Sequence, residues 1–367
     1  MAMRNSRFTI HIKSSQGISV TRIDDFLSVQ CIRRINQPGS LEFTLPGNHP
    51  AISSLEDRSI VELWMSNTSM GLPWTCETRG LYLAQNQRSS LGTVFTASCP
   101  GPLWLLSTRI IAYPPRVSGR SLFSGEAGWI ARQLVRFNTT AEASTTNGRL
   151  RNGGVNGIVV EADSGGGLQF DWECACDNLL ASLQKLGQAV GSDFDLIYLP
   201  PKNWYFRWYN GISGSDRTES AIFDLGSGNM LEPVYVFDSR QAKNVIVASG
   251  FDSAGSQIFN VQEGLWTVQE GDDYLEGRTA ESYLHVPNCK TGFELAGRAK
   301  ALLNKSKPQE QIKFRIRQVD MLQYGIDYFL GDKVTVRWAG NTLQKQVREI
   351  KILLQPDEKQ DLEVEIS

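Results

Sequence analysis

The feature that most constrains the fold is a pattern of alternating strands that occurs twice, once near each end of the chain. In each run apolar and polar residues alternate, which is typical of strands with one buried and one exposed face. The N-terminal run reads LEFTLP, SLEDRSIVELWM, GLYLAQNQ and TVFTAS, and the C-terminal run reads IKFRIR, FLGDKVTVRW, VREIKILLQ and LEVEIS. Short strands at this spacing favour small barrels or sandwiches. We therefore expect two similar small β-barrels.

The second strand begins in the same way in both runs. A Leu-x-Asp sequence followed by Arg or Lys opens a strand that reaches a Trp. The matching residues are Leu55, Asp57, Arg58 and Trp64 in the first run, and Leu330, Asp332, Lys333 and Trp338 in the second. One extra residue, Ser59, and a longer loop at 71–78 make the match imperfect. We interpret it as a duplication, while noting that half-buried antiparallel meanders share this alternation.

The length of 367 residues exceeds one ordinary core, so the chain should divide into domains. The sequence predicts an N-terminal β-barrel over residues 1–112, an α+β insertion over 113–235, and a C-terminal part over 236–367 with the second barrel. The insertion contains a loop at 138–168 that is rich in Thr, Asn, Ser and Gly. The predicted fold is thus mainly β, with a helix-plus-hairpin insertion between the two barrels.

Helices are predicted where apolar residues recur at helical spacing. Residues 126–135 form a short amphipathic helix, and the stripe from Leu179 to Val190 forms another, with Asp177 as its expected N-cap. A third helix at 291–305 has a capping box of Thr291 and Glu294.

Aromatic residues are concentrated in the strand NWYFRWY, the second strand of a predicted hairpin. Alternation places Trp204 and Trp208 on one face, and Arg207 on the other. A strand with two apolar faces favours burial between domains or subunits. Stacking on sugars or bases is the alternative.

Candidate catalytic groups are scattered. The histidines His11, His49 and His285 are far apart, and the paired cysteines Cys174 and Cys176 have no second pair, so no metal site is expected. No Gly-x-Ser-x-Gly or P-loop sequence occurs. We therefore expect no catalytic residue, no metal and no cofactor. The net charge of −2 gives no general reason to expect nucleic-acid binding.

No stretch of 18 apolar residues and no signal peptide is seen, so we expect no membrane-spanning segment and folding in a cytoplasm.

The chain resembles the baseplate-hub or tail-associated proteins of tailed bacteriophages, including the tail-tip hubs of siphophages and the hubs of contractile tails. GSLEFTLP with LEDRSIVELW is similar to the opening barrel of that family. PGPLWLLSTRIIAYPP resembles the segment that follows, and NLLASLQKLGQAVGSDFDLIY resembles its insert. YGIDYFLGDKVTVRW, residues 324–338, is similar to its late signature and is the most specific of these motifs.

This resemblance implies a virion structural protein at the tail tip, assembled in the host cytoplasm. Three copies would form a ring that adapts a sixfold tail tube to a threefold tip and surrounds the DNA passage, without sequence-specific binding. The implied partners are the distal tail protein, the tail tube, the tape measure, and tip or fibre proteins. Because the sequence ends at Ser367, receptor recognition or wall cleavage would belong to another chain.

The expected structural and interface residues come from both repeats, the signature and the aromatic strand. They are Asp57, Val61, Leu63, Trp64, Trp204, Trp208, Tyr324, Gly325, Asp327, Leu330, Gly331, Asp332, Val334, Val336 and Trp338. Three alternatives stay open: a hexameric distal-tail ring, a tail protein that binds host-surface carbohydrate through exposed Trp204 and Trp208, and a wall-degrading hydrolase.

Overall fold

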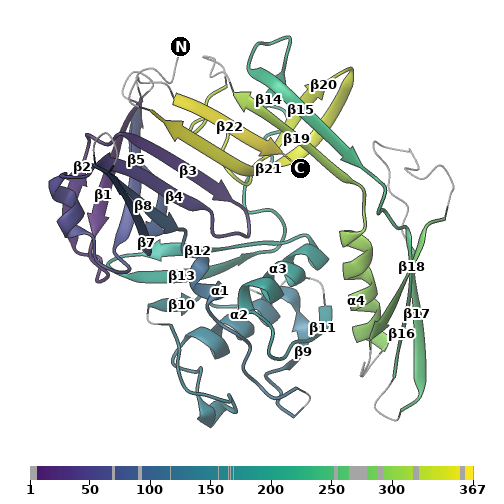
Figure 1. Cartoon of the computed structure of the whole chain (residues 1–367). Coiled ribbons are helices and arrows are strands. Elements are labelled where there is room, and N and C mark those ends of the chain that lie inside the picture. The colour runs from purple at the N-terminus through teal and green to yellow at the C-terminus, as the bar shows by residue number, and fades with distance from the viewer. Residues whose placement is uncertain are drawn as a thin grey trace.

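The computed structural model shows a mainly β protein with few helices and several antiparallel sheets, in agreement with the predicted class (Figure 1). It describes residues 6–67, 71–89, 93–115, 117–155, 157–163, 165, 167, 169–251, 255–263, 279–286, 292–316, 322–355 and 360–366.

The N-terminal part consists of two sheets that share a core. One has the strand order β2-β1-β5-β6, and the other, β3-β4-β8-β7, is one end of a ten-stranded sheet. Leu41, Phe43 and Leu45 of β4 are buried while Glu42 between them is exposed, as the alternating pattern predicts. The strands are β1 (Arg7–Lys13), β2 (Ser19–Ile23), β3 (Ser28–Arg34), β4 (Ser40–Pro46), β5 (Ile60–Asn67), β6 (Leu72–Leu81), β7 (Ala84–Ser89) and β8 (Thr93–Pro100).

The C-terminal part supplies the other end of the ten-stranded sheet, in the order β15-β19-β22-β21, with β20 paired to β21 and β14 paired to β20. The strands are β14 (Ile222–Asp224), β15 (Met230–Asp238), β19 (Gln309–Ile316), β20 (Lys333–Trp338), β21 (Asn341–Leu354) and β22 (Gln360–Ile366). The strand expected after the Leu-Gly-Asp turn is therefore confirmed as β20.

Strand pairing follows the same plan in the two parts. In the N-terminal part β4 pairs with β8 and β5 with β6, and in the C-terminal part β19 pairs with β22 and β20 with β21. After β6 the chain enters β7, which pairs with β8, just as the second half of β21 pairs with β22. The parts differ beyond this plan, because β5 has antiparallel β1 as its other neighbour whereas β20 has parallel β14.

The two parts join through β3 and β21, which pair antiparallel from Arg34 opposite Glu349 to Val29 opposite Leu354. Among the described residues no sheet closes on itself, so the expected barrels are wrong: the two parts share one open ten-stranded sheet, and the N-terminal part adds a separate four-stranded sheet. The physical reason is that the free edge of β3 bonds to the other part, which leaves it unavailable for closure within its own. One core serves both ends of the chain, with Ile10 and Phe43 in the same cluster as Phe314 and Ile350.

The insert has its own core, built between helices and a three-stranded sheet of order β10-β13-β12. The predicted hairpin is confirmed as β12 and β13. Its elements are α1 (Trp104–Ser107), β9 (Leu122–Glu126), α2 (Ala127–Thr139), β10 (Ile158–Val160), β11 (Gln169–Glu173), α3 (Leu179–Val190), β12 (Asp193–Leu199) and β13 (Asn203–Tyr209).

Two expectations for the insert need correction. The N-cap of α3 is Asn178 rather than Asp177, because Asn178 has the extended backbone and its side chain accepts from Ala181 N at 3.1 Å. The segment 138–168 is also more than a loop, since it holds the end of α2, a 3-10 turn at Thr145–Asn147, and strand β10, which pairs parallel to β13.

A small third layer follows the insert. Strands β16 (Val245–Phe251), β17 (Gln257–Glu263) and β18 (Glu281–Val286) form a sheet of order β17-β16-β18, and α4 (Gly292–Lys305) packs on it. Figure 1 shows α4 between this sheet and the insert, where it contacts α3. The expected capping box of Thr291 and Glu294 lies outside the described side chains.

In the described part of the chain, every helix is too short or too polar to cross a membrane.

Candidate functional site

The signature at residues 324–332 is a turn that ties the C-terminal part to the N-terminal part. Tyr324 is buried, and its hydroxyl donates to Glu77 Oε2 at 2.8 Å while it accepts from Arg33 Nη1 at 2.9 Å. Burial raises the pKa of Tyr324, so the phenol keeps the proton that it donates. The ring therefore connects the signature to β6 and β3.

The first half of the turn is closed by its own polar groups. Asp327 Oδ2 accepts from Gln323 N at 2.7 Å, and Gly325 N donates to Tyr328 O at 3.1 Å. Gly325 has a φ of +85°, and a Cβ there would contact Met65 of β5 at 3.4 Å. Glycine is needed because the backbone is left-handed at this position.

The second half of the turn is organised by the buried carboxylate of Asp332. Its Oδ1 accepts from Ser215 N at 2.7 Å and its Oδ2 from Phe329 N at 2.9 Å, and Arg217 forms an ion pair with it at 2.8 Å. Gly331 has a φ of +95°, and a Cβ there would lie 2.6 Å from Ser213 Oγ. Residues 213–217, which follow the insert, are thereby fixed against the signature.

A chain of hydrogen bonds continues from the signature into the insert. Gln346 Nε2 donates to Gly331 O at 3.1 Å and to Asp193 Oδ2 at 2.7 Å. Asp193 also accepts from Ser213 N at 2.7 Å and from Asn36 Nδ2 at 3.3 Å. Buried Asp193 thus joins three parts of the chain through neutral donors. The sequence showed it only as a polar residue at the start of a strand.

The strands that follow the Leu-x-Asp sequences supply core residues. Val61 and Leu63 of β5, and Val334 and Val336 of β20, are fully buried in the shared core. Leu330 and Trp338 are partly buried against the same core.

The two aspartates that match in sequence occupy different environments. Asp57 has a side chain that is 78% exposed, and it forms an ion pair with neighbouring Arg58 at 3.6 Å. Asp332 is only 2% exposed and bonds to Ser215 and Phe329. The residues after the insert, which have no counterpart beside Asp57, create this difference.

Trp64 belongs to a charged cluster on the face of β5 that is turned away from the shared core. Its Nε1 donates to Glu62 Oε2 at 2.9 Å, and Lys13 and Arg79 pair with Glu62 at 2.9 Å and 2.8 Å. Burial by itself would raise the pKa of Glu62, but the hydrogen bonds from Lys13, Arg79 and Trp64 bring that pKa below its usual value. Both cations also lie over the ring of Tyr198 in β12, which connects this sheet to the insert.

Trp204 and Trp208 lie in the core of the insert, and each is 4% exposed. Trp208 stacks on Phe194 with ring centroids 6.0 Å apart. Because neither ring reaches the surface of the chain, these residues offer no platform on which a sugar could stack.

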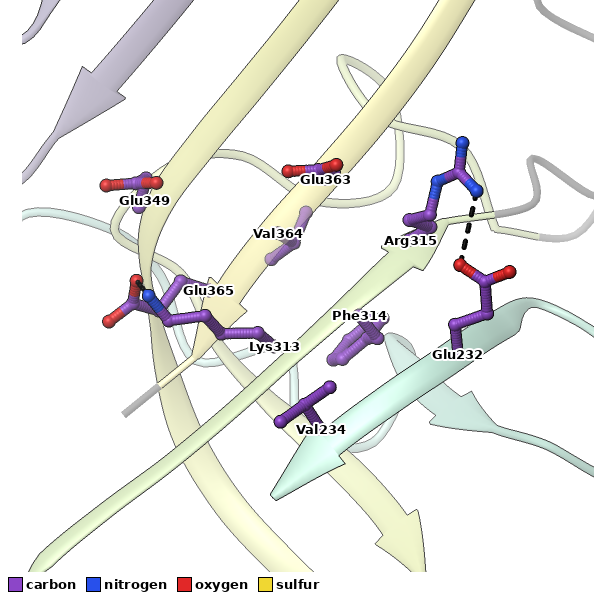
Figure 2. Close-up of a pocket in the computed structure, with 9 residues that line it drawn as sticks. All are labelled: Glu232, Val234, Lys313, Phe314, Arg315, Glu349, Glu363, Val364 and Glu365. Atoms are coloured by element: carbon purple, nitrogen blue, oxygen red, sulfur yellow. Dashed lines mark hydrogen bonds and ion pairs between the residues drawn. The ribbon is translucent and has the colours of Figure 1, made fainter. Parts of the chain in front are cut away.

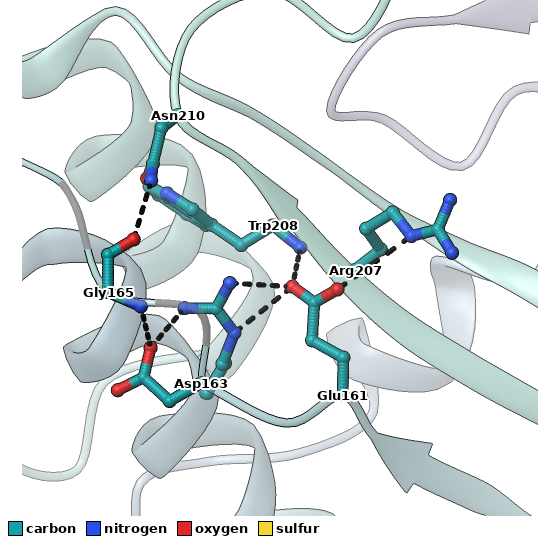
Figure 3. Close-up of polar contacts among 7 residues, drawn as sticks. Glu161, Asp163, Gly165, Arg207, Trp208 and Asn210 are labelled. Carbon is teal, nitrogen blue, oxygen red and sulfur yellow. Dashed lines mark hydrogen bonds and ion pairs between the residues drawn. The ribbon is translucent and has the colours of Figure 1, made fainter.

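A buried arginine anchors the segment after β10 to the insert (Figure 3). Arg132 is 3% exposed, and its guanidinium bonds to Glu161 at 2.8 Å and 3.0 Å and to Asp163 at 2.9 Å. Glu161 Oε1 also accepts from Trp208 N at 2.7 Å, and Arg207 lies 3.7 Å from Glu161. The positive charge of Arg132 is therefore neutralised inside the protein.

The outer face of the ten-stranded sheet carries paired charges around a pocket of about 220 Å³ (Figure 2). Its lining residues are Glu232, Val234, Lys313, Phe314, Arg315, Glu349, Glu363, Val364 and Glu365. Every carboxylate among them has a cationic partner: Lys313 with Glu365 at 2.6 Å, Arg315 with Glu232 at 3.2 Å, Lys351 with Glu363 at 3.3 Å, and Arg34 with Glu349. The face is thus polar but locally neutral.

Strands β7 and β15 form the two ends of the ten-stranded sheet, and β7 pairs with β8 alone while β15 pairs with β19 alone among the described strands. The exposed apolar side chains of β15 are 38–58% exposed and comprise Leu231, Val234, Tyr235, Val236 and Phe237. An exposed apolar edge of this length is a surface on which another strand can pair.

The groups that could carry chemistry lie apart. His11 stacks on Trp64, His49 bonds to Asp25 at 3.0 Å, and His285 bonds to Ser249 at 3.0 Å. No group of three metal-binding side chains occurs among the described residues.

The thiols of Cys31, Cys76 and Cys174 are inert for a common reason. Burial raises the pKa of each to about 12, so thiolate is scarce at neutral pH.

Comparison with known families gives one match that spans nearly the whole chain. The model of the family described as Siphovirus ReqiPepy6 Gp37-like protein matches residues 10–366. A search of curated proteins gave no match.

Solved structures with a similar fold include proteins described as tail proteins. A tail protein from Neisseria meningitidis MC58 aligns with a TM-score of 0.60 at 11% identity, over 99% of this chain and 96% of that chain. The 43 kDa tail protein of prophage MuSo2 from Shewanella oneidensis gives 0.62 at 12% identity, over 99% and 98%. Prophage tail protein gp18 from Listeria monocytogenes EGD-e gives 0.54 at 14% identity, over 97% and 94%. At these identities the likeness establishes the fold alone.

Proposed function

Because the chain belongs to the phage tail protein family described as Siphovirus ReqiPepy6 Gp37-like, we propose that it is a non-enzymatic hub at the tail tip. Three copies form a ring that adapts a sixfold tail tube to a threefold tip and surrounds the DNA passage. The observation that carries this proposal is the repeated pairing plan, which leaves one strand edge open at each end of the ten-stranded sheet.

The repeated pairing plan suggests which strand edges of neighbouring copies would pair. β3 and β15 occupy equivalent positions, because β3 pairs with β4 and β15 pairs with β19, the first strand of each repeat. β7 is equivalent to the second half of β21, because β7 pairs with β8 and β21 pairs with β22, the last strand of each repeat. Within the chain β3 pairs with β21. The equivalent pairing for the open edges is β15 of one copy with β7 of the next, in the same antiparallel direction. This contact would cover the apolar edge of β15.

Repetition of this contact produces a ring because the join inside the chain and the join between copies are equivalent. Each chain contributes two similar units, so three chains place six units around the axis and match a sixfold tube. The insert and the β16–β18 layer differ from those units, and they would keep threefold symmetry for contacts with tip or fibre proteins. The distal tail protein, tail tube and tape measure would be the neighbours on the other side.

The paired charges on the outer face of the sheet suit a surface that DNA passes. Free Lys and Arg on a surface bind phosphates and release counterions, which would hold DNA in place. Here Lys313, Lys351 and Arg315 each already contact a glutamate. We propose that this face lines the passage and lets DNA slide without sequence-specific binding.

The experiment that tests the ring is native mass spectrometry of the full chain across a concentration series. We expect trimers for the natural sequence and a shift toward monomers for Val236→Glu in β15 and for Asn86→Pro in β7. The matched control is Ile18→Glu, which puts the same charge at a 67% exposed apolar residue just before β2, in neither edge strand, and should leave the trimer intact. Circular dichroism checks that each variant is folded.

The other outcomes contradict the proposal. Hexamers would indicate a ring nearer the tube, such as a distal-tail ring. Monomers at every concentration up to about 100 μM, or trimers that the edge substitutions leave intact, would refute assembly through β7 and β15.

A further inference from the structure

Two arginines of the insert are buried to a similar degree but have opposite surroundings. Arg132 is 3% exposed and is neutralised by Glu161 and Asp163. Arg149 is 6% exposed, and within the described residues its guanidinium contacts only neutral oxygens. Burying a cation without a counter-charge is costly, so Arg149 is a position where an anion would be stabilised.

The contacts of Arg149 use only part of its hydrogen-bonding capacity. Its Nε donates to Asn138 Oδ1 at 3.4 Å, one Nη to Arg151 O at 2.6 Å, and the other to Ile110 O at 3.3 Å. A guanidinium has five N–H groups, so two remain. The backbone around it is held in place, because Leu150 N donates to Ala112 O at 2.8 Å.

Two more arginines add positive charge at the same place. Arg109 is partly buried, and its Nε donates to the backbone oxygen of Asn138 at 2.8 Å, while Arg151 is exposed. Burial, and then the charges of Arg149 and Arg151, hold the pKa of Arg109 below its usual range. Among the described residues no Asp or Glu forms an ion pair with any of these three arginines.

Apolar side chains flank the three arginines. Ile110 is 50% exposed and Leu150 is 64% exposed, and each is next to an arginine in the sequence. This surface lies on the insert near the end of α2 (Figure 1), and none of its residues belongs to β7 or β15. It is therefore separate from the strand edges assigned to the ring.

We propose that Arg109, Arg149 and Arg151, with Ile110 and Leu150, form a docking site for an acidic, partly apolar segment of another tail protein. A carboxylate of that segment lies against the guanidiniums, and its apolar side chains cover Ile110 and Leu150. An acidic peptide fits better than DNA, because the positive charge is one compact cluster bordered by apolar residues rather than a stripe that follows a phosphate backbone.

The test uses the full chain and a fluorescein-labelled peptide of alternating Leu and Glu, with a Leu and Gln peptide of equal length as the uncharged control. Binding is measured by fluorescence anisotropy, and a 20-base-pair DNA duplex is tested in parallel. Arg109→Gln and Arg151→Gln should each weaken the binding of the acidic peptide by ~10-fold or more, as expected for loss of a charge-assisted hydrogen bond. Arg149 is left unchanged because it is buried.

The matched control variant is Arg207→Gln in the same insert. Arg207 is 46% exposed and already faces Glu161, so its loss should leave peptide binding unchanged. Three results would overturn the proposal. The Leu and Gln peptide could bind as tightly as the acidic peptide, or the acidic peptide could fail to bind at 1 mM. Arg207→Gln could also weaken binding as much as Arg109→Gln and Arg151→Gln do. Tighter binding of DNA through the same arginines would show a nucleic-acid site instead. The mass of the particle is measured separately, so failure here leaves the ring proposal standing.

Discussion

The buried carboxylate of Asp332 permits a sharp test of how the signature works. The substitution Asp332→Asn keeps the size of the side chain and changes only its charge and one hydrogen-bonding group. Asp332 accepts two backbone N–H groups, from Ser215 and Phe329, and pairs with Arg217. Asn offers one oxygen, so one of the two N–H groups would face an NH2 group and lose its acceptor.

The expected cost follows from these contacts. Loss of one hydrogen bond to a charged group is worth about 1.5–3 kcal/mol. The ion pair with Arg217, whose side chain is 32% exposed, adds about 0.5–1 kcal/mol after screening by solvent. Asp332→Asn should therefore lower the free energy of unfolding by about 2–4 kcal/mol.

Asp327→Asn is the matched control within the same turn. Asp327 Oδ2 accepts one backbone N–H, from Gln323, and the oxygen of Asn can take over that single bond. Its cost should stay below about 1 kcal/mol. Equilibrium unfolding in urea, followed by tryptophan fluorescence and circular dichroism, measures both variants. Equal effects of the two substitutions, or an effect of Asp332→Asn below 1 kcal/mol, would refute the reasoning.

Three further predictions concern buried side chains: Glu62, Tyr324 and Phe206. Glu62→Gln leaves Lys13 and Arg79 without their carboxylate and should cost about 2–4 kcal/mol at pH 7 in urea unfolding. Because the folded pKa of Glu62 lies below its reference value of 4.5, this contribution is complete above pH 4.5 and is lost as the pH falls through the folded pKa, so the natural protein and the variant should converge in acid. Tyr324→Phe removes the hydroxyl that bridges the partly exposed Arg33 and the buried Glu77 and should cost about 1–3 kcal/mol, measured by the same unfolding curves. Phe206→Ala leaves a cavity at a fully buried position in the insert and should lower the free energy of unfolding by about 3–5 kcal/mol. The midpoint of thermal unfolding should fall, and native mass spectrometry should still show the trimer.

The pairing of distant strands shows why the barrels could not be predicted. Alternation in LEFTLP and IKFRIR fixes which side chains face a core, and β4 and β19 follow it. It contains no information on which strand lies beside β3. Each part alone could have closed, but the edge of β3 pairs with β21, which begins more than 300 residues later in the chain.

The candidate site also contains some residues that the sequence indicates and others that only the folded structure brings together. Sequence indicated Gly325, Gly331 and Asp332 because turns need left-handed glycines and carboxylates that accept backbone N–H groups. The local sequence places Asp193 only at the start of a strand, because its partners Asn36 and Gln346 come from opposite ends of the chain. No local sequence pattern predicts a contact between residues that are so far apart in the chain.

By itself, the sequence determined the local features of this protein: its strands, its amphipathic helices, its glycine turns, and a repeat of strand patterns at the two ends. These depend on backbone sterics and on the period of apolar residues, which act between near neighbours. Only the tertiary structure decided that the two repeats share one sheet and one core, that Asp57 is exposed while Asp332 is buried, and that Arg132 is neutralised while Arg149 is not. Burial and charge pairing are properties of residues brought together from distant parts of the chain, and they are fixed only when the chain is folded.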